Sequence, residues 1–413
     1  MKIKLSSDWP YQLLFLIAII FSYINFYELS LAVWLFVLCV SVKRYYSKSI
    51  IVYISIFILI AILGTFRSFF YDHPLYNVFR DISYFIKPVV GLLIGYQCFR
   101  SSTNNFFKTV IYCSTFIAAA HFIILFVSAL FNPINNIHDI RAYGGYFSDL
   151  EAYAIIILIF HKKFKLEFSA KKRWFFILFI GGSLALYLAR TNMIQIFILG
   201  CGMLGLFEIS KKKMIAFLAF CLVAGIGYKI IYDMNPARRG TGFEAFLYKI
   251  KNAPMEIYDP YVVNDNSSRF HDNFRSYETK VTIQQVAYKE DLGIWLGNGF
   301  GATVNYGSSV ATNDGTDVRH APILHNGYTT VFLKTGIAGL ILYLISTFYL
   351  SFYGQKTNNQ YLNNIKLLIN SSGIFLFIST LVFLGYYLKL DNKSLFVGGL
   401  LAYYEIIKNE QKG

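Results

Sequence analysis

Residues 49–66 read SIIVYISIFILIAILGTF and contain no charged side chain. A helix needs about 20 mostly apolar residues to cross the hydrocarbon core of a bilayer, so this stretch is predicted to be a membrane-spanning helix. Similar stretches recur along the chain, and we predict about 12 spans in total. They lie at residues 10–28, 29–42, 49–66, 82–98, 109–131, 146–160, 174–189, 192–209, 214–231, 325–352, 366–388 and 393–407.

The composition of the whole chain also indicates a membrane protein. Of 413 residues, 56 % are hydrophobic, 18 % are aromatic and only 15 % are charged. Soluble globular proteins carry about 25 % charged residues and cannot bury so large an apolar fraction. The five cysteines lie in or beside predicted spans and include no CxxC pair, which disfavours a disulfide framework. The composition excludes a cytosolic enzyme and a disordered chain, and it predicts an all-α polytopic membrane protein.

The distribution of Lys and Arg between the predicted loops predicts the orientation. Positive side chains concentrate in the cytoplasmic loops of membrane proteins. If the N-terminus is cytoplasmic, the inner loops hold the basic segments 162–173 and 211–213, and the short outer loops are poorer in Lys and Arg. Both termini are therefore expected in the cytoplasm. The net charge of +15 follows from this bias, and no basic soluble domain that would bind nucleic acid is present.

One polar segment interrupts the apolar pattern. Residues 232–324 are rich in Gly, Asn and Asp and, in this orientation, form a long periplasmic loop between the ninth and tenth spans. A loop of this length is uncommon unless it has a function. The chain is thus predicted to contain spans one to nine at residues 1–231, the loop at 232–324, and spans ten to twelve at 325–413.

The loop itself is expected to be partly helical. Residues 243–252 and 268–291 are predicted to be helices, because apolar residues in the second stretch recur at helical spacing. The following run, LGNGFGATVNYGSS, is a Gly-rich turn region. It is not interpreted as a phosphate-binding loop, because no GK[ST] follows the glycines.

Several cationic or titratable residues map to the outer face of the predicted topology. Ionisable side chains at membrane depth are costly and usually face a cavity. An Arg at a helix end can instead be a snorkelling anchor, although Arg190 lies between two apolar runs with almost no loop. His320 and Lys334 are interpreted as structural residues, the latter on a helix face. The residues on this face are Arg80, Arg141, Arg190, Arg275, His320 and His325.

Converging arginines indicate an anionic ligand. Guanidinium groups bind phosphate through paired hydrogen bonds and stay charged at any working pH. A His that titrates near neutrality can accept a proton from a hydroxyl group. Together these residues predict transfer from a lipid diphosphate to an alcohol. No HExxH or DxD pattern occurs, so no metal is predicted. The main group of acidic residues consists of Asp139, Asp149 and Glu151. These side chains are expected to hydrogen-bond within their loop, to hold a cation or to act as a base.

Four motifs occur in a characteristic order. RAYGGYF at 141–147 contains an Arg-x-x-Gly stretch, and LARTNMIQIFILG at 188–200 places an Arg at the outer end of a middle span. RSYETKVTIQQVAYKEDLGIWLGNGFG at 275–301 combines an Arg with a Gly-rich run. HNGYTTVFLKTGIAGLILYL at 325–344 has HN at the mouth of a helix and a GxxG after it. Over roughly residues 80–352, the chain resembles the bacterial O-antigen polymerase and O-antigen ligase superfamily.

The resemblance implies a glycosyltransferase of the GT-C type in the bacterial inner membrane, with a periplasmic active site. It implies an undecaprenyl-diphosphate-linked glycan as donor, inversion at the anomeric carbon, and no metal or other cofactor. The acceptor would be a lipid-linked repeat unit or lipid A–core. Membrane lipids and a chain-length regulator would be further partners.

The resemblance also implies roles for single residues. His325 would be the catalytic residue that acts on the acceptor hydroxyl. Binding of the donor diphosphate would involve Arg190, Arg275, Arg80 and Arg141. Contacts to the acceptor or within the loop would involve His320, Asn326 and Glu151.

The acceptor distinguishes the alternatives within the superfamily. A polymerase transfers the growing glycan to another lipid-linked repeat unit, whereas a ligase transfers it to lipid A–core in lipopolysaccharide biosynthesis. Protein O-oligosaccharyltransferases share the motifs. We favour a polymerase, because the chain lacks the close HxH of some ligases and is rich in Phe, Tyr, Ile and Asn. A lipid-linked oligosaccharide transporter is an alternative of another class, but the chain does not show two similar halves.

Overall fold

The computed structural model is 76 % helical. A two-stranded antiparallel sheet is the only sheet in the part of the chain that the structure describes. The described residues are 9–24, 26–42, 45–100, 106–132, 140, 143–145, 148–208, 211–238, 244–259, 261–265, 267–289, 291–311, 317–389 and 391–410.

The apolar helices indicate a membrane-embedded protein, as the sequence predicts. Within the described ranges, five helices are long and apolar enough to cross a membrane. They are α3 (Lys48–Ser68), α4 (Leu75–Phe99), α5 (Phe106–Phe131), α15 (Gly327–Ser351) and α16 (Gln360–Val382). Two further apolar helices, α1 (Trp9–Tyr23) and α2 (Tyr27–Ser41), have 15 residues each.

Every predicted span contains a helix, but several of these helices are short. α7 (Asp149–Ile159) has 11 residues and α9 (Arg190–Met203) has 14, whereas a straight spanning helix needs about 20. Helix length and composition therefore support five of the predicted spans. The other helices at predicted spans are α8 (Ala170–Leu186), α10 (Lys211–Asp233) and α17 (Lys393–Glu410).

The predicted span at 366–388 is wrong at its end. α16 stops at Val382, because the backbone of Phe383 is extended and Gly385 has a φ of +56°. A short 3-10 helix, η1 (Gly385–Tyr387), follows. The Tyr387 ring stacks on Phe85 of α4 at 4.3 Å between ring centres. The chain therefore turns into the apolar core after α16 and does not continue as a helix.

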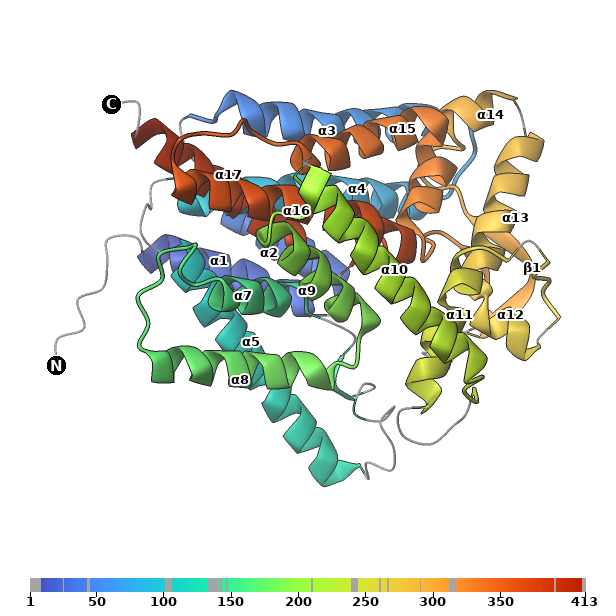
Figure 1. Ribbon diagram of the computed structural model, residues 1–413. Coiled ribbons are helices and arrows are strands. Elements are labelled where there is room, and N and C mark those ends of the chain that lie inside the picture. The colour runs from blue at the N-terminus through green and yellow to red at the C-terminus, as the bar shows by residue number, and fades with distance from the viewer. Residues whose placement is uncertain are drawn as a thin grey trace.

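Among its described residues, the polar segment before α15 contains four helices and a β-hairpin. α11 (Glu244–Ile257) overlaps the predicted helix at 243–252, and the predicted helix at 268–291 is divided at Asn273. In Figure 1, α11, α12, α13 and β1 lie together at one end of the helix bundle, and α17 ends at the opposite end. The remaining elements are α12 (Ser268–Asp272), α13 (Phe274–Lys289), α14 (Asp291–Leu296), β1 (Val304–Ala311) and β2 (Asp317–Ala321).

The hairpin of β1 and β2 is not predicted from the sequence. The two strands pair antiparallel, with an irregularity between Asn305 and Val310. Val304, Tyr306 and Val310 are buried and face a core. Ser308 between them is exposed, so the alternation expected from the pleat of a strand is incomplete in β1. The three buried residues belong to a second apolar cluster with Phe270 of α12 and with residues of α13 and α15. This cluster attaches the polar segment to the membrane helices.

A buried carboxylate organises the start of this polar segment. Asp259 is only 1 % exposed. Arg269 donates to both carboxylate oxygens at 2.9 Å, and the Asn273 side chain donates to Oδ2 at 2.8 Å. The hydrogen bonds from Arg269 hold the pKa of the Asp259 carboxyl below its ordinary value. Asp259 therefore fixes α12 and the start of α13 against the segment that precedes them.

The Gly-rich run between α14 and β1 packs backbone to backbone against a kink in α15. Gly336 interrupts α15 with φ +62° and ψ −160°, a conformation that strongly favours glycine. The kink leaves carbonyl groups without helical partners. Asn298 donates its backbone N–H to Leu333 at 2.9 Å, and Gly299 donates to Lys334 at 3.1 Å. The run is therefore a packing element between α14 and β1.

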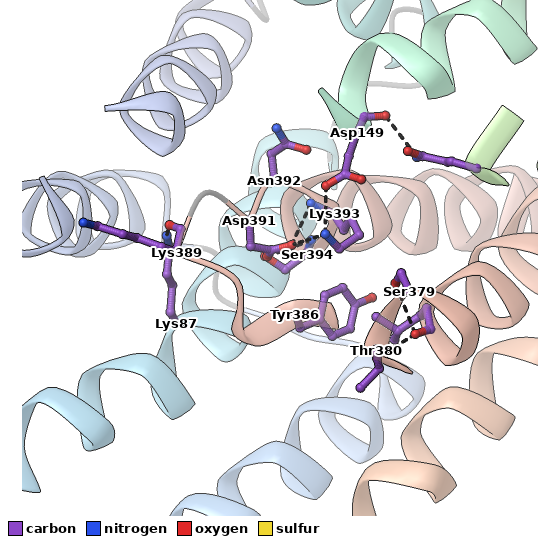
Figure 2. Close-up of polar contacts among 12 residues, drawn as sticks. Lys87, Asp149, Ser379, Thr380, Tyr386, Lys389, Asp391, Asn392, Lys393 and Ser394 are labelled. Atoms are coloured by element: carbon purple, nitrogen blue, oxygen red, sulfur yellow. Dashed lines mark hydrogen bonds and ion pairs between the residues drawn. The ribbon is translucent and has the colours of Figure 1, made fainter. Parts of the chain in front are cut away.

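A second polar cluster is buried among the helices. Figure 2 shows Lys393, at the start of α17, between Asp149 of α7 and Asp391. Its Nζ lies 2.8 Å from Asp149 Oδ2 and 3.5 Å from Asp391 Oδ1. All three residues are less than 5 % exposed. Because a buried charge is costly unless it is paired, this cluster fixes α17 against α7 within the bundle.

Candidate functional site

A cavity of about 230 Å³ lies where α9, α11, α13 and the end of α16 meet. Its walls combine charged side chains with a larger apolar surface from Ile194, Ile257, Ile378, Leu381 and Val382. The polar residues that line it include Arg190, Thr191, Glu256, Arg275, Thr279 and Asn326. A cavity of this kind suits an amphipathic anion, because arginines bind its charged group and the apolar wall accepts a hydrocarbon portion.

Two arginines that are far apart in the sequence meet at this cavity. Arg190 is the first residue of α9, and Arg275 lies in the first turn of α13. Both pair with Glu256 of α11, at 3.0 Å for Arg190 Nη2 to Oε2 and 3.6 Å for Arg275 Nη1 to Oε1. The fold therefore brings together two arginines that are far apart in the sequence, as expected for arginines that converge on one site.

The surroundings of Arg275 differ from those of a solvated surface residue. Its side chain is 21 % exposed, and the guanidinium carbon lies 5.2 Å from the centre of the Phe383 ring. Burial lowers the pKa of Arg275 from its ordinary value, and the neighbouring Glu256 carboxylate opposes this shift. Guanidinium remains charged even so. Arg275 is therefore a partly desolvated cation that gains from an anionic partner.

A His–Glu contact lies directly beside the cavity. His325 Nδ1 lies 2.8 Å from Glu278 Oε2, and the backbone N–H of His325 donates to the same oxygen at 3.1 Å. The other carboxylate oxygen accepts from the Tyr306 hydroxyl at 2.5 Å. Burial and the Glu278 carboxylate raise the pKa of Tyr306, which keeps its hydroxyl protonated. The His325 side chain is 51 % exposed, whereas that of Glu278 is 2 % exposed.

The start of α15 positions these groups. Asn326 caps the helix, because its side-chain oxygen accepts from the backbone N–H groups of Tyr328 and Thr329. The cap fixes the residue before it, His325, at the mouth of α15. Thr279, one turn after Arg275 on α13, contacts Thr329 at 3.2 Å between hydroxyl oxygens. α13 therefore contributes Arg275, Glu278 and Thr279 to one face that packs on the mouth of α15.

Other predicted site residues lie elsewhere. Arg80 lies 3.4 Å from Asp81 and does not line the cavity. His320 is exposed on β2. Glu151 is fully buried in α7 among membrane helices. Arg141 and Asp139 lie outside the described residues. The structure thus brings together Arg190, Arg275, His325 and Asn326, and it separates Arg80, His320 and Glu151 from them.

The interpretation of Lys334 as a helix-face residue is wrong. Its side chain is 0 % exposed and pairs with Asp81 of α4 at 2.5 Å. It also donates to the carbonyl of Ala302, while Gly301 donates its backbone N–H to Asp81 at 2.7 Å. The physical reason is the position of Lys334 just before the Gly336 kink, where α15 packs on α4 and on the Gly-rich run.

Two acidic residues of the site, Glu256 and Glu278, are absent from the sequence prediction. Glu278 follows Arg275 by three residues, which places both on one face of a helix. That spacing was a usable signal, because a carboxylate beside a predicted site Arg is a candidate partner. Glu256 has no such signal, since it approaches the arginines only through the packing of α11.

The chain matches no protein-family model and no curated protein. In the described part of the chain, no group of three or more His, Cys, Asp or Glu side chains is arranged to hold a metal ion. Two guanidinium groups can bind an anion through two of its phosphate oxygens. An exposed imidazole nitrogen can accept a proton when a carboxylate holds the other ring nitrogen.

Proposed function

We propose that the protein is an inner-membrane glycan polymerase. In this proposal, it transfers an undecaprenyl-diphosphate-linked glycan to the hydroxyl of another lipid-linked repeat unit on the periplasmic side of a bacterial membrane. The chain would cross the membrane about 12 times, with both termini in the cytoplasm. The product would be O-antigen or a related surface polysaccharide.

One observation above all supports this function. Arg190 and Arg275, from different parts of the chain, line one cavity with an apolar wall, and the His325–Glu278 contact lies beside it. A polyprenyl diphosphate has the matching chemistry, because it joins two phosphate groups to a hydrocarbon chain. The placement of the polar segment at one end of the bundle, opposite the end of α17, agrees with a site on one membrane face (Figure 1).

The proposed reaction is a single displacement at the anomeric carbon. The acceptor hydroxyl attacks this carbon, and His325 Nε2 takes the hydroxyl proton as the new C–O bond forms. The bond between the anomeric carbon and the diphosphate oxygen breaks, and the leaving diphosphate gains a negative charge. Arg190 and Arg275 stabilise that charge through charge-assisted hydrogen bonds. A single displacement inverts the anomeric configuration and needs no covalent intermediate.

A deletion strain tests the function and separates it from the alternatives. Surface glycan is analysed on a gel, and lipid-linked glycan is extracted in parallel. Single repeat units on lipid A–core would support the polymerase, because ligation survives without polymerisation. Long polymer retained on the lipid carrier, with bare core at the surface, would instead indicate a ligase. Repeat units confined to the inner leaflet would indicate a transporter.

A further inference from the structure

We propose that Glu256 is a built-in competing anion of the two-arginine cavity, which a phosphorylated ligand has to displace. The inference rests on the proposed function for the identity of that ligand, a lipid diphosphate. It assigns to Glu256 a role in setting the affinity of the site, and it predicts that the cavity binds anions more tightly without this carboxylate.

The first argument is the position of the carboxylate. Arg190 Nη2 donates to both Glu256 oxygens, at 3.0 and 3.2 Å, and Arg275 Nη1 lies 3.6 Å from Oε1. One carboxylate is therefore shared by two guanidinium groups. Carboxylate and phosphate bind guanidinium through the same forked hydrogen bonds. Glu256 thus occupies hydrogen-bonding positions that a bound diphosphate needs.

The second argument is the charge of the cavity. Arg190 and Arg275 are 27 % and 21 % exposed in their side chains. Two partly desolvated cations close together are unfavourable without an anion. Glu256, itself 20 % exposed, compensates part of this charge when no ligand is bound. A ligand that binds both arginines makes this compensation unnecessary.

The third argument is the packing of α11, the helix that carries Glu256. None of the residues of α11 is buried. Pro254, inside the helix, has no N–H to donate to the helical ladder. The carbonyls of Lys249 and Lys251 on α11 accept from Arg190 and Tyr228. The Tyr248 and Asn252 side chains of α11 donate to Asp272 and Asn273. Glu256 lies in the last turn of α11, and a change of its side-chain rotamer is enough to take the carboxylate away from the arginines without moving the helix.

The pairing of Glu256 with the arginines lowers the apparent affinity of the cavity for anions. A ligand that needs a minor state of the protein binds more weakly, in proportion to the population of that state. Glu256 therefore lowers the apparent affinity of every anion that requires both arginines. The return of Glu256 to Arg190 and Arg275 also competes with the product diphosphate and favours its release.

The test is calorimetric titration of the purified full-length protein, in detergent micelles, with inorganic pyrophosphate. The variants are Glu256→Gln, which removes the charge and keeps the shape, and Glu244→Gln as a matched control. Glu244 also lies on α11, but it accepts from the backbone N–H of Ala237 and does not line the cavity. Thermal unfolding of each variant establishes that it is folded.

We expect Glu256→Gln to bind pyrophosphate about tenfold more tightly than the wild type. This is the factor expected when one partly exposed charge-assisted contact no longer competes with the ligand. Glu244→Gln should bind like the wild type. Equal or weaker binding by Glu256→Gln would overturn the role of Glu256 while leaving the anion site intact. An equal gain in both variants would also overturn it, because the effect would then be general charge. Absence of binding in all three proteins would contradict the diphosphate site of the proposed function as well.

Discussion

At the scale of single residues, the contact between Glu278 and His325 determines which nitrogen of the imidazole carries the proton. A carboxylate only accepts hydrogen bonds, so His325 Nδ1, 2.8 Å from Glu278, is the donor. The lone pair is therefore on Nε2, which can accept a proton from an acceptor hydroxyl. Tyr306 holds the other oxygen of Glu278 and fixes the carboxylate in turn.

The first prediction concerns this contact. Glu278→Gln should lower kcat for glycan transfer about a hundredfold, because the neutral amide no longer stabilises the imidazolium that forms when Nε2 takes the hydroxyl proton. KM for the donor should change little, since Arg190 and Arg275 remain. Tyr306→Phe removes one hydrogen bond to Glu278 and should have a smaller effect. Steady-state kinetics check this, and a kcat within twofold of the wild type in Glu278→Gln would refute the positioning role.

The site shows which residues a sequence can identify. Arg190, Arg275 and His325 are prominent because each is a charged or titratable group at the edge of an apolar run. Arg80 has the same sequence signal, but its neighbour Asp81 pairs with it. Glu256 lies on a helix whose sequence resembles that of an ordinary solvent-exposed helix. Its role depends on tertiary packing, which brings together groups from three separate segments and leaves no local pattern.

At the scale of elements, the Gly-rich run and the kink in α15 make one close backbone-to-backbone contact. A Cβ atom on Gly336 would lie 2.4 Å from the Trp295 carbonyl carbon, and one on Gly297 would lie 2.4 Å from the Thr335 nitrogen. Two glycines are thus needed for one close backbone contact. The sequence identifies Gly297 as part of a turn region, but only the fold places it against Gly336. The hairpin of β1 and β2 was missed because its irregular register interrupts the alternation in β1.

The second prediction concerns the pH dependence of the segment around Asp259. Its pKa is lowered in the folded protein, mainly by hydrogen bonds from Arg269. A lowered folded-state pKa stabilises the fold fully above the unfolded value of about 3.9, and this stabilisation is lost as the pH falls through the folded value. Asp259→Asn should therefore show faster amide hydrogen exchange than the wild type in α12 and α13 at pH 7.

Acidification provides the control for this prediction. After correction for intrinsic exchange rates, the difference between wild type and Asp259→Asn should shrink as the pH falls below about 4. Other carboxyl groups titrate equally in both proteins, so the difference isolates Asp259. A difference that stays constant from pH 7 to pH 3 would mean that the Asp259 charge does not stabilise this segment.

At the scale of the whole molecule, buried ion pairs connect the membrane helices to the polar segment. Asp81 of α4 and Lys334 of α15 are 1 % and 0 % exposed, and both bind the backbone at residues 301 and 302. Those residues lead into β1, which carries Tyr306. The orientation of Glu278 and His325 therefore depends on contacts that begin in the helix bundle. The apolar helices were predictable from hydropathy, whereas this long-range pairing was not.

The third prediction follows from the Asp81–Lys334 pair. Lys334→Met should lower the free energy of unfolding by about 3–5 kcal/mol, because the buried Asp81 carboxylate loses its closest cation and keeps only the 3.4 Å contact with Arg80. The double variant Asp81→Asn with Lys334→Met should regain part of this loss, since no buried charge then remains. Denaturation in mixed micelles measures both. Equal stability of Lys334→Met and the wild type would show that the pair does not stabilise the fold.

The most direct measurement is glycan transfer by the purified protein in liposomes that contain one undecaprenyl-diphosphate-linked repeat unit and no other glycan. A polymerase needs no further substrate, because the same lipid serves as donor and acceptor. The wild type should produce lipid-linked chains of several repeat units, and folded His325→Ala should produce none. Chain extension by His325→Ala at the wild-type rate, or transfer by the wild type only after lipid A–core is added, would contradict the proposed mechanism or the proposed acceptor, respectively.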